Sequence, residues 1–282
     1  MTDKFYLSVL WKMVMGYKLD WKHPKTFNEK LQWLKLNDRN PLYTTLVDKY
    51  RVKQWVADKI GEQYVIPTLA VYNSVDEIDL NKLPNQFVLK CNHDSGSVVI
   101  CRDKSSFDLE AAKQKLGKAL KKNFYWEARE WPYKNVKRCI FAEKFLEEVI
   151  DSKMIMKTPN DYKFFCFNGT PKMFQTCEDR NETEGAILKF FDINGNLLEI
   201  KDKYHNRESD GKLSLPSNLE EMLTICRIIA ENKFFVRVDF YEIKGKTYCG
   251  EVTFYENGGF CEFTPEKYNR VLGDWIKLPT DK

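Results

Sequence analysis

A chain of 282 residues is long enough for a large core and for one or two domains. Lys and Arg outnumber Asp and Glu by 45 to 41, and a net charge of +4 is too mild to imply a nucleic-acid partner. Aromatic residues make up 14% of the chain, which argues against disorder.

The eight cysteines occur singly and form no CxxC pair, so a zinc site is not expected. No signal peptide opens the sequence, and we expect reduced thiols and a cytoplasmic location. The segment from Phe5 to Met15 is apolar but contains Lys12 and is too short to span a bilayer. Packing on the protein core is its preferred interpretation, and a place at the inner membrane surface is the alternative.

The first quarter of the chain is predicted to be helical. Thr26-Phe-Asn-Glu29 is a capping box that begins one helix, and Asn37 to Pro41 ends it. A second helix is expected from about Thr44 to Ile60, with Gly61 as its C-terminal stop.

Strands dominate the rest of the sequence. Apolar and alternating runs predict strands at 65–72, 86–92, 97–102, 139–148, 161–167, 171–178, 187–192, 234–243 and 246–256. Hairpin turns are expected at Asn168-Gly169, Asn194-Gly195 and Lys244-Gly245. Helices are predicted at 74–77, at 108–122, at 218–232 and from about Thr264.

This order of elements indicates the α+β class, with two α/β lobes, mostly antiparallel sheets and an N-terminal helical segment. We expect three segments: 1–62 is the helical segment, 63–142 the first lobe and 143–282 the second lobe. A cleft between such lobes is a usual place for a ligand.

The second lobe carries a candidate metal site. Alternation places Arg237, Asp239 and Tyr241 on one face of a strand, and Glu251 and Thr253 share a face of the next strand. A three-residue loop would set Asp239 opposite Glu251, and a two-residue loop would offset the pair by one. Opposed carboxylates repel each other unless a cation lies between them, and Mg²⁺ prefers such oxygen ligands. A solvated strand face with harmless charges is the alternative.

The first lobe carries a candidate phosphate site. A strand delivers Lys90, and the loop from Asn92 to Ser97 returns into the next strand. Backbone N–H groups and hydroxyls of such a loop can surround phosphates, with Lys90 as a point charge. The spacing differs from that of a Walker A loop. A hairpin loop with a surface lysine is the alternative.

The strand that ends in Glu143-Lys144-Phe145-Leu146 would suit a hinge that offers backbone groups to an adenine edge. An edge strand with two charges is the alternative. These pieces and their order resemble the ATP-grasp superfamily, and more closely its TupA-like family from bacterial surface polysaccharide clusters. The resemblance rests on the segments 25–50, 87–100, 130–147, 161–172 and 235–260.

The resemblance implies an ATP-grasp fold with ATP and Mg²⁺ as cofactors. It implies that Lys90 contacts the ATP phosphates under a lid of Ser95, Gly96 and Ser97, and that Arg237 stabilises an acylphosphate. It assigns adenine to Glu143 and to the backbone of Lys144, Phe145 and Leu146, ribose to Asp151, a further nucleotide contact to Lys49, and magnesium to Asp239 and Glu251.

The implied activity is an ATP-dependent ligase that joins a carboxylate to an amine through an acylphosphate. Family context points to a uronic acid of a capsule, O-antigen or cell-wall polysaccharide precursor, and to an amino acid or another amine. Two departures from the family pattern bear on this. Thr253 stands where asparagine is usual, and the segment 1–62 is short for a full preceding domain.

Three other functions remain open from the sequence. A glycosyltransferase of polysaccharide biosynthesis would need an Asp-x-Asp type motif, and Asp76-Glu-Ile-Asp79 is the nearest run, although a helix start explains it better. A silent binding module and a sugar kinase with the same ATP-binding lobes are the other two.

Overall fold

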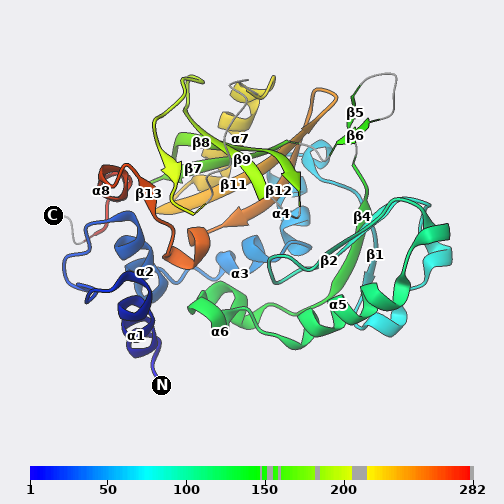
Figure 1. The fold of residues 1–282 in the computed structure, drawn as a ribbon, viewed down its shortest axis with the longest axis horizontal. Coiled ribbons are helices and arrows are strands. Elements are labelled where there is room, and N and C mark those ends of the chain that lie inside the picture. Colours follow the sequence, from blue (N-terminus) through cyan, green and yellow to red (C-terminus); the bar gives the residue numbers. More distant parts are fainter. Residues whose placement is uncertain (147, 151–154, 158–159, 182–184, 205–214, 280–282) are drawn as a thin grey trace. The chain divides into compact units, whose positions relative to one another are not determined.

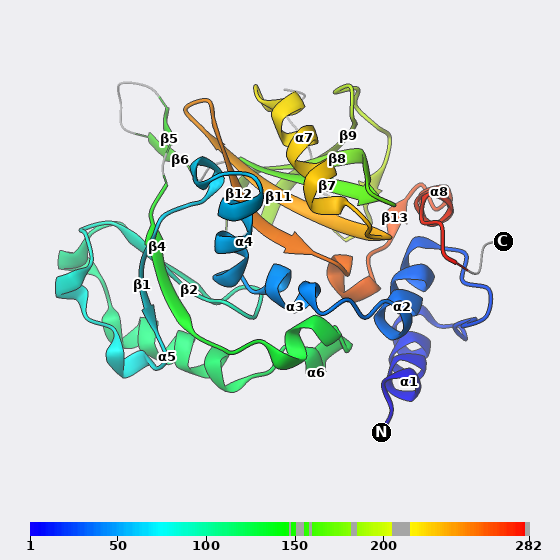
Figure 2. The same ribbon diagram turned by 180° about the vertical axis from the view of Figure 1, so that it is seen from behind.

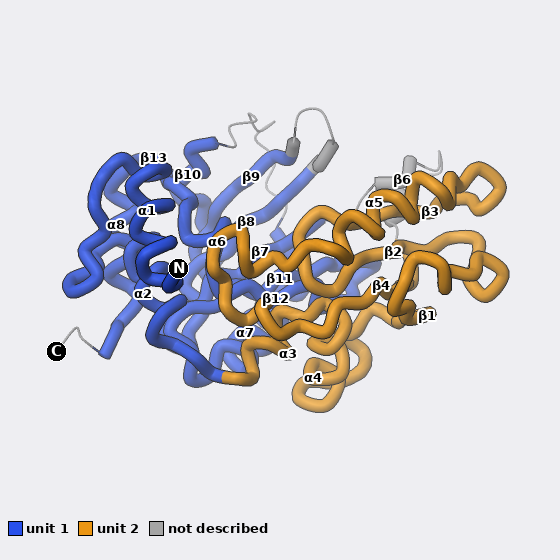
Figure 3. The backbone as a smooth tube through the Cα atoms, turned by 90° about the horizontal axis from the view of Figure 1, so that it is seen from below, with its two compact units in different colours: residues 1–40, 148–282 blue, residues 41–147 orange. Residues whose placement is uncertain are grey.

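A computed structural model describes residues 1–146, 148–150, 155–157, 160–181, 185–204 and 215–279. The chain forms two compact units, and each is described by itself. Unit 1 consists of residues 1–40 and 148–282, and unit 2 of residues 41–147 (Figure 3). No helix among the described residues is both long and apolar enough to cross a membrane.

Two helices begin unit 1: α1 (Asp3–Met15) and α2 (Phe27–Asn37). The predicted capping box of α2 is confirmed, because the Thr26 side chain accepts the N–H of Glu29 and the Glu29 side chain accepts the N–H of Thr26. α1 buries Leu7 and Trp11 completely, so one face of this helix packs on the protein core, as the preferred interpretation of the segment predicts.

The second predicted helix is in fact two helices in unit 2, α3 (Leu42–Val47) and α4 (Arg51–Lys59). Asp48 separates them, since its carboxylate Oδ1 accepts the backbone N–H groups of Tyr50 and Arg51, each at 3.0 Å. A side chain that binds these donors competes with a continuous helical backbone. The prediction of one helix from Thr44 to Ile60 was therefore wrong at its centre.

Unit 2 is built on an antiparallel sheet in the order β1-β4-β2-β3 (Figure 1). Its strands are β1 (Thr68–Tyr72), β2 (Phe87–Cys91), β3 (Val98–Cys101) and β4 (Ile140–Lys144). Helix α5 (Leu109–Lys121) packs along β2, and α6 (Tyr125–Ala128) is a single turn. Short 3₁₀ turns lie at Glu62–Tyr64, Val75–Glu77, Leu80–Lys82, Lys104–Ser106 and Trp131–Asn135.

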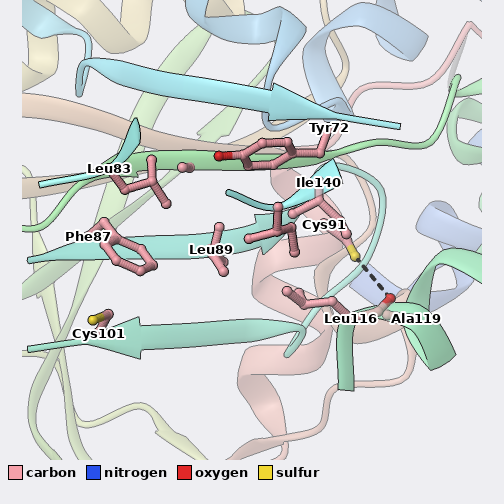
Figure 4. Packing of buried hydrophobic residues seen from close by; sticks show 11 residues of the cluster. Tyr72, Leu83, Phe87, Leu89, Cys91, Cys101, Leu116, Ala119 and Ile140 are labelled. Atoms are coloured by element: carbon pink, nitrogen blue, oxygen red, sulfur yellow. Dashed lines mark hydrogen bonds between the residues drawn. The ribbon is translucent and has the colours of Figure 1, made fainter. Parts of the chain in front are cut away.

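The apolar core of unit 2 lies between this sheet and α5 (Figure 4). Phe87, Leu89 and Cys91 alternate along β2 and point into this core together with Leu116 of α5. The thiol of Cys91 also donates to the Leu116 carbonyl at 3.7 Å. Since Lys90 occupies the intervening position on β2, its side chain leaves the opposite face of the sheet.

Unit 1 contains a larger antiparallel sheet in the order β12-β11-β7-β8-β9. Its strands are β7 (Asp161–Phe167), β8 (Thr170–Asn181), β9 (Gly185–Asp192), β11 (Phe235–Ile243) and β12 (Lys246–Thr253). Helix α7 (Leu219–Ala230) packs across β7, β8 and β11 on one face of this sheet (Figure 2). The predicted Asn168-Gly169 turn joins β7 to β8, with both residues at positive φ.

Smaller pieces complete unit 1. β5 (Glu148–Ile150) pairs with β6 (Ile155–Lys157), and β10 (Lys201–Asp202) pairs with β13 (Phe263–Thr264). A 3₁₀ turn at Glu256–Gly259 follows β12, and helix α8 (Lys267–Trp275) packs against α2. All strand pairs of the described residues are antiparallel, which confirms the predicted α+β class.

The β11–β12 hairpin turns through two residues, Lys244 and Gly245, because Ile243 pairs with Lys246. A bulge at Gly250 then restores the pairing of Asp239 with Glu251. A Cβ on Gly250 would lie 2.8 Å from a ring carbon of Tyr241, so only glycine fits without a shift of that ring. The opposed carboxylates were predicted correctly, but a bulge produces them rather than a longer loop.

The compact units do not follow the three predicted segments. Helices α1 and α2 belong to unit 1 whereas α3 and α4 belong to unit 2. Compact units and domains are different divisions of a chain, so the domain boundaries at 62 and 142 stay predictions. The expected cleft between two lobes stays a prediction as well.

Candidate functional site

A row of charged side chains crosses three strands of the unit 1 sheet. Asp239 on β11 pairs with Lys163 on β7 and with Glu251 on β12. Paired residues of neighbouring strands project from the same face of a sheet. The three charges therefore stand side by side on the face opposite to Val238 and Phe164, which are fully buried.

The Asp239 carboxylate is buried and is bound by two cations. Arg237 donates to it in a bidentate manner, with Nε–Oδ1 at 2.6 Å and Nη2–Oδ2 at 2.7 Å. The Lys163 ammonium donates to Oδ2 at 2.5 Å and also lies 2.6 Å from Asp161 Oδ2. Burial would raise the pKa of Asp239, but the attraction of Arg237 and Lys163 outweighs it and holds the pKa below its ordinary value.

The Arg237 guanidinium contacts several other side chains of this cluster. Besides Asp239 it binds Glu256 through Nη1, and its Nη2 lies 3.8 Å from Glu251 Oε2 and donates to Thr253 Oγ1 at 3.3 Å. Burial would lower the pKa of Arg237, but the surrounding carboxylates raise it well above its usual range. A cation fixed in this way suits a developing negative charge on a bound group.

The donor set fits a divalent cation only together with further oxygen ligands. Asp239 and Glu251 supply two carboxylates, the number that Mg²⁺ commonly takes alongside substrate phosphates. Within the described ranges no three His, Cys, Asp or Glu side chains are grouped so that they could hold a metal ion by themselves. The Glu251 side chain is 26% exposed and the Asp239 side chain 4%, so Glu251 is the more accessible of the two carboxylates.

Helix α2 anchors the loop that follows β12. The Lys35 side chain is fully buried, donates to the Gly258 carbonyl at 2.6 Å, and lies over the rings of Tyr255 and Phe260. Gln32 donates to the same carbonyl at 3.2 Å and to that of Gly259 at 2.8 Å. The loop carries Glu256, so α2 positions the partner of Arg237.

Unit 2 contains a second charged cluster, formed by one carboxylate and two ammonium groups. Lys53 Nζ donates to Glu143 Oε2 at 2.8 Å, and Lys90 pairs with the other carboxylate oxygen. Burial would raise the pKa of Glu143, but the two lysines hold it below its ordinary value. Burial lowers the pKa of Lys53 despite the attraction of Glu143, and Lys90 adds to that shift. The cluster carries one positive charge in excess, which suits an anionic ligand.

The loop between β2 and β3 is fixed at its ends and exposed at its tip. The buried Asn92 accepts the N–H of Cys139 and donates to the Lys137 carbonyl, and Lys49 donates to the Asp94 carbonyl at 2.6 Å. The Ser97 hydroxyl is buried and bonded to Asp94. Ser95 and Gly96 are exposed, and Gly96 has a φ of +97°, which favours glycine.

A pocket of about 490 Å³ opens beside this loop within unit 2. The loop lines one side of the pocket, and α5 with the segment after it lines the other through Lys115, Lys118 and Lys122. Three lysines and a glycine-containing loop are consistent with binding of an anion. The predicted lid residues thus line a basic pocket beside α5, whereas the Lys90 side chain leaves the opposite face of the sheet. The Ser97 hydroxyl already has an internal partner.

The predicted adenine hinge begins at the end of β4. Glu143 points its carboxylate to the two lysines, and the Lys144 N–H donates to the Pro67 carbonyl at 3.0 Å. The Lys144 N–H is therefore already bonded within unit 2, and the adenine assignment of the hinge stays a prediction. Asp151, the predicted ribose ligand, lies outside the described residues.

Four charged partners of these clusters were missed by sequence reasoning: Lys53, Asp161, Lys163 and Glu256. Lys163 follows Asp161 by two positions on β7, so strand alternation could have found it. Lys53 and Glu256 gave no local signal, because their partners are distant in the sequence or lie across a loop. Asp79, from the nearest Asp-x-Asp-like run, accepts the N–H of Asn81 and caps a 3₁₀ turn.

Comparisons with solved structures gave distant matches, among them the following three. D-alanine–D-alanine ligase from Bacillus anthracis complexed with ATP has 16% identity and a TM-score of 0.41, over 88% of this chain and 62% of that chain. N5-carboxyaminoimidazole synthetase from Staphylococcus aureus complexed with ADP has 14% identity and a TM-score of 0.45, over 88% and 59%. L-amino acid ligase from Bacillus licheniformis has 12% identity and a TM-score of 0.47, over 92% and 56%.

The chain spans less than two thirds of the length of each of these three proteins. A comparison with curated proteins gave no match. The TupA-like ATPgrasp family, in contrast, matches residues 29–277, which include both charged clusters and the loop beside the pocket. The chain therefore belongs to the TupA-like ATPgrasp family, as its sequence motifs predicted.

Proposed function

We propose that this protein is an ATP-dependent carboxylate–amine ligase that forms an amide through an acylphosphate. One observation carries the proposal: two carboxylates, Asp239 and Glu251, stand opposite each other beside the fixed guanidinium of Arg237. Because the chain belongs to an ATPgrasp family, ATP is the ligand that we expect this cluster to bind.

In the proposed reaction the substrate carboxylate attacks the γ-phosphorus of ATP, and ADP leaves. The amine then attacks the carbonyl carbon of the acylphosphate, inorganic phosphate leaves, and the amine loses a proton. Bound Mg²⁺ would offset phosphate charge, with Asp239 and Glu251 as its protein ligands. Arg237 would stabilise charge on the transferred phosphoryl group.

The unit 2 cluster would bind the phosphates of ATP. Lys90 and Lys53 share one carboxylate, so an anion would balance their excess charge. Ser95 and Gly96 would cover the phosphates from the exposed tip of the loop, and Lys49 would hold that loop through the Asp94 carbonyl. Positioning and electrostatics would then supply the catalysis, without a protein nucleophile.

We further propose a uronic acid of a bacterial capsule, O-antigen or cell-wall polysaccharide precursor as the carboxylate substrate. An amino acid or another amine would be the acceptor. Such a precursor would place the enzyme in the cytoplasm at the inner membrane surface. Family context supports these substrates, and the basic groups of unit 1 are compatible with an acidic glycan.

The test is a screen of uronic acids against amines, followed by ADP release and product mass. Asp239→Ala and Glu251→Ala should each abolish ADP release, whereas Glu242→Ala on the same hairpin should retain it. Turnover that persists in both site variants would refute the metal assignment. UDP release from a sugar nucleotide would favour a glycosyltransferase, and a phosphorylated sugar would favour a kinase. A failure to bind ATP with magnesium in calorimetry would favour a silent binding module.

A further inference from the structure

Helix α1 has apolar side chains on two opposite faces. Leu7 and Trp11 are fully buried, and Trp11 packs against Tyr17 and Phe260. On the other face, Phe5, Val9 and Met13 recur every four residues with exposed fractions of 60%, 44% and 77%. An exposed apolar face on a helix whose opposite face is already buried indicates a surface for a binding partner.

The exposed apolar stripe continues at the N-terminal end of the helix. Met1 precedes Phe5 by one more step of four residues and is 79% exposed. The stripe therefore extends from Met1 to Met13 in unit 1. Single exposed apolar residues are normal on a protein surface, but an aligned row of them marks an interaction site.

Positive charge gathers around this stripe. The first 25 residues contain five lysines and two aspartates, so they contribute three of the four net positive charges of the chain. Lys12 lies on α1 itself and is exposed, and Lys18 and Lys22 are exposed in the segment that follows. This combination of apolar and basic residues complements an anionic lipid surface.

The segment after α1 is tied back to that helix. Trp21 donates its indole N–H to the Ser8 hydroxyl at 2.9 Å, and the Lys4 ammonium lies 5.9 Å from the centre of the Trp21 ring. The basic residues of this segment are thus held close to α1 rather than on a separate arm. Trp21 is also half-buried, as suits an aromatic side chain at a membrane interface.

This segment contributes to a basic pocket of about 290 Å³ in unit 1. The residues that line it are Lys22, His23, Pro24, Lys25, Lys30, Arg270, Asp274 and Lys277. Arg270 pairs with Asp274, and Lys30 donates to the Ile276 carbonyl. As far as the chain is described, no carboxylate pairs with the ammonium groups of Lys22, Lys25 or Lys277. Such a pocket suits a phosphate group.

We propose that α1 docks this protein on an anionic membrane: its exposed stripe enters the interface, and the neighbouring basic pocket binds a lipid phosphate headgroup. The inference extends the location proposed above but does not depend on the ligase reaction. An interfacial helix of this kind lies in the plane of the membrane and needs no membrane-spanning segment.

The test is cosedimentation of the full chain, without ATP, with vesicles of phosphatidylcholine alone or mixed with phosphatidylglycerol. We expect binding to the anionic vesicles, weakened by salt, and little binding to the neutral ones. Phe5→Gln/Met13→Gln should weaken binding by roughly tenfold or more, because two apolar side chains that the membrane would bury are lost. Lys12→Gln/Lys22→Gln should weaken it by about fivefold per lysine.

Matched controls separate this surface from nonspecific effects. Ile228→Gln removes an exposed apolar residue from α7, and Lys172→Gln/Lys246→Gln removes two exposed lysines elsewhere in unit 1; neither should change binding. Equal binding of all variants would overturn the proposal. A dimer that Phe5→Gln/Met13→Gln abolishes, without vesicle binding, would also overturn it and would assign the face to self-association. ADP release from soluble substrates is measured separately, so loss of the ligase proposal would leave this result intact.

Discussion

Glu143→Gln provides a direct test of the unit 2 cluster. The substitution keeps the shape of the side chain but removes the only negative charge in a buried group with Lys53 and Lys90. Loss of one partner from a buried ion pair costs about 3–5 kcal/mol. The two lysine side chains are 13% and 20% exposed, and solvent screens part of their repulsion. We therefore expect a loss of about 2–3 kcal/mol in the free energy of unfolding.

Chemical denaturation at neutral pH measures this loss, and a thermal scan should show a midpoint lower by roughly 5–10 °C. Glu110→Gln is the matched control, because Glu110 is exposed and pairs with Lys113 on the surface of α5. That variant should lose less than about 1 kcal/mol. An equally small loss for Glu143→Gln would refute the description of a buried cluster.

The same variant carries a pH signature. The folded pKa of Glu143 lies below its ordinary value of 4.5, so its stabilising effect is present above that value. This effect is lost as the pH falls through the folded pKa, and the gap between wild type and variant should close there. ATP should also raise the melting temperature of the variant more than that of the wild type, since phosphates would offset two unbalanced ammonium groups.

Three further predictions concern unit 1. The wild type should lose unfolding free energy as the pH falls below about 3.8, because the folded pKa of Asp239 lies below that ordinary value. Asp239→Asn removes the titrating group, so the unfolding free energy of this variant should depend less on pH in the same range. Denaturation at several acidic pH values checks this. Gly250→Ala should cost about 1–3 kcal/mol, since the new methyl group would crowd Tyr241; Gly245→Ala, with open space around it but a positive φ, is the comparison in denaturation. Lys35→Met should lower kcat more than it raises KM for ATP, because the loop after β12 loses its anchor; an unchanged kcat would show that the anchor is dispensable.

Local patterns explain why much of the fold could be predicted. Strand alternation, turn dipeptides and one capping box are short-range signals, and each depends on neighbouring residues only. The capping box at Thr26 and the turn at Asn168-Gly169 were confirmed for this reason. The break at Asp48 was missed because a carboxylate that binds the following backbone N–H groups looks, in sequence, like an ordinary polar position of a helix.

The candidate site was predictable to the extent that its residues share a strand or face each other across one hairpin. Arg237, Asp239 and Glu251 meet this condition, and the structure brings them together. Lys53 reaches Glu143 across 90 residues of chain, and no periodicity encodes such a contact. The sequence likewise could not show that the Ser97 hydroxyl bonds to Asp94.

The bulge at Gly250 adds one residue to β12, and this shifts the pairing of the two strands as a turn longer by one residue would. A turn longer by one residue, without the bulge, would bring the same two carboxylates face to face. Deletion of Gly250 together with a one-residue insertion after Gly245 should therefore preserve the Asp239–Glu251 juxtaposition, whereas either change alone would displace it. The deletion and the insertion thus compensate for each other, so the turn of the hairpin can be redesigned while Asp239 and Glu251 remain opposite each other.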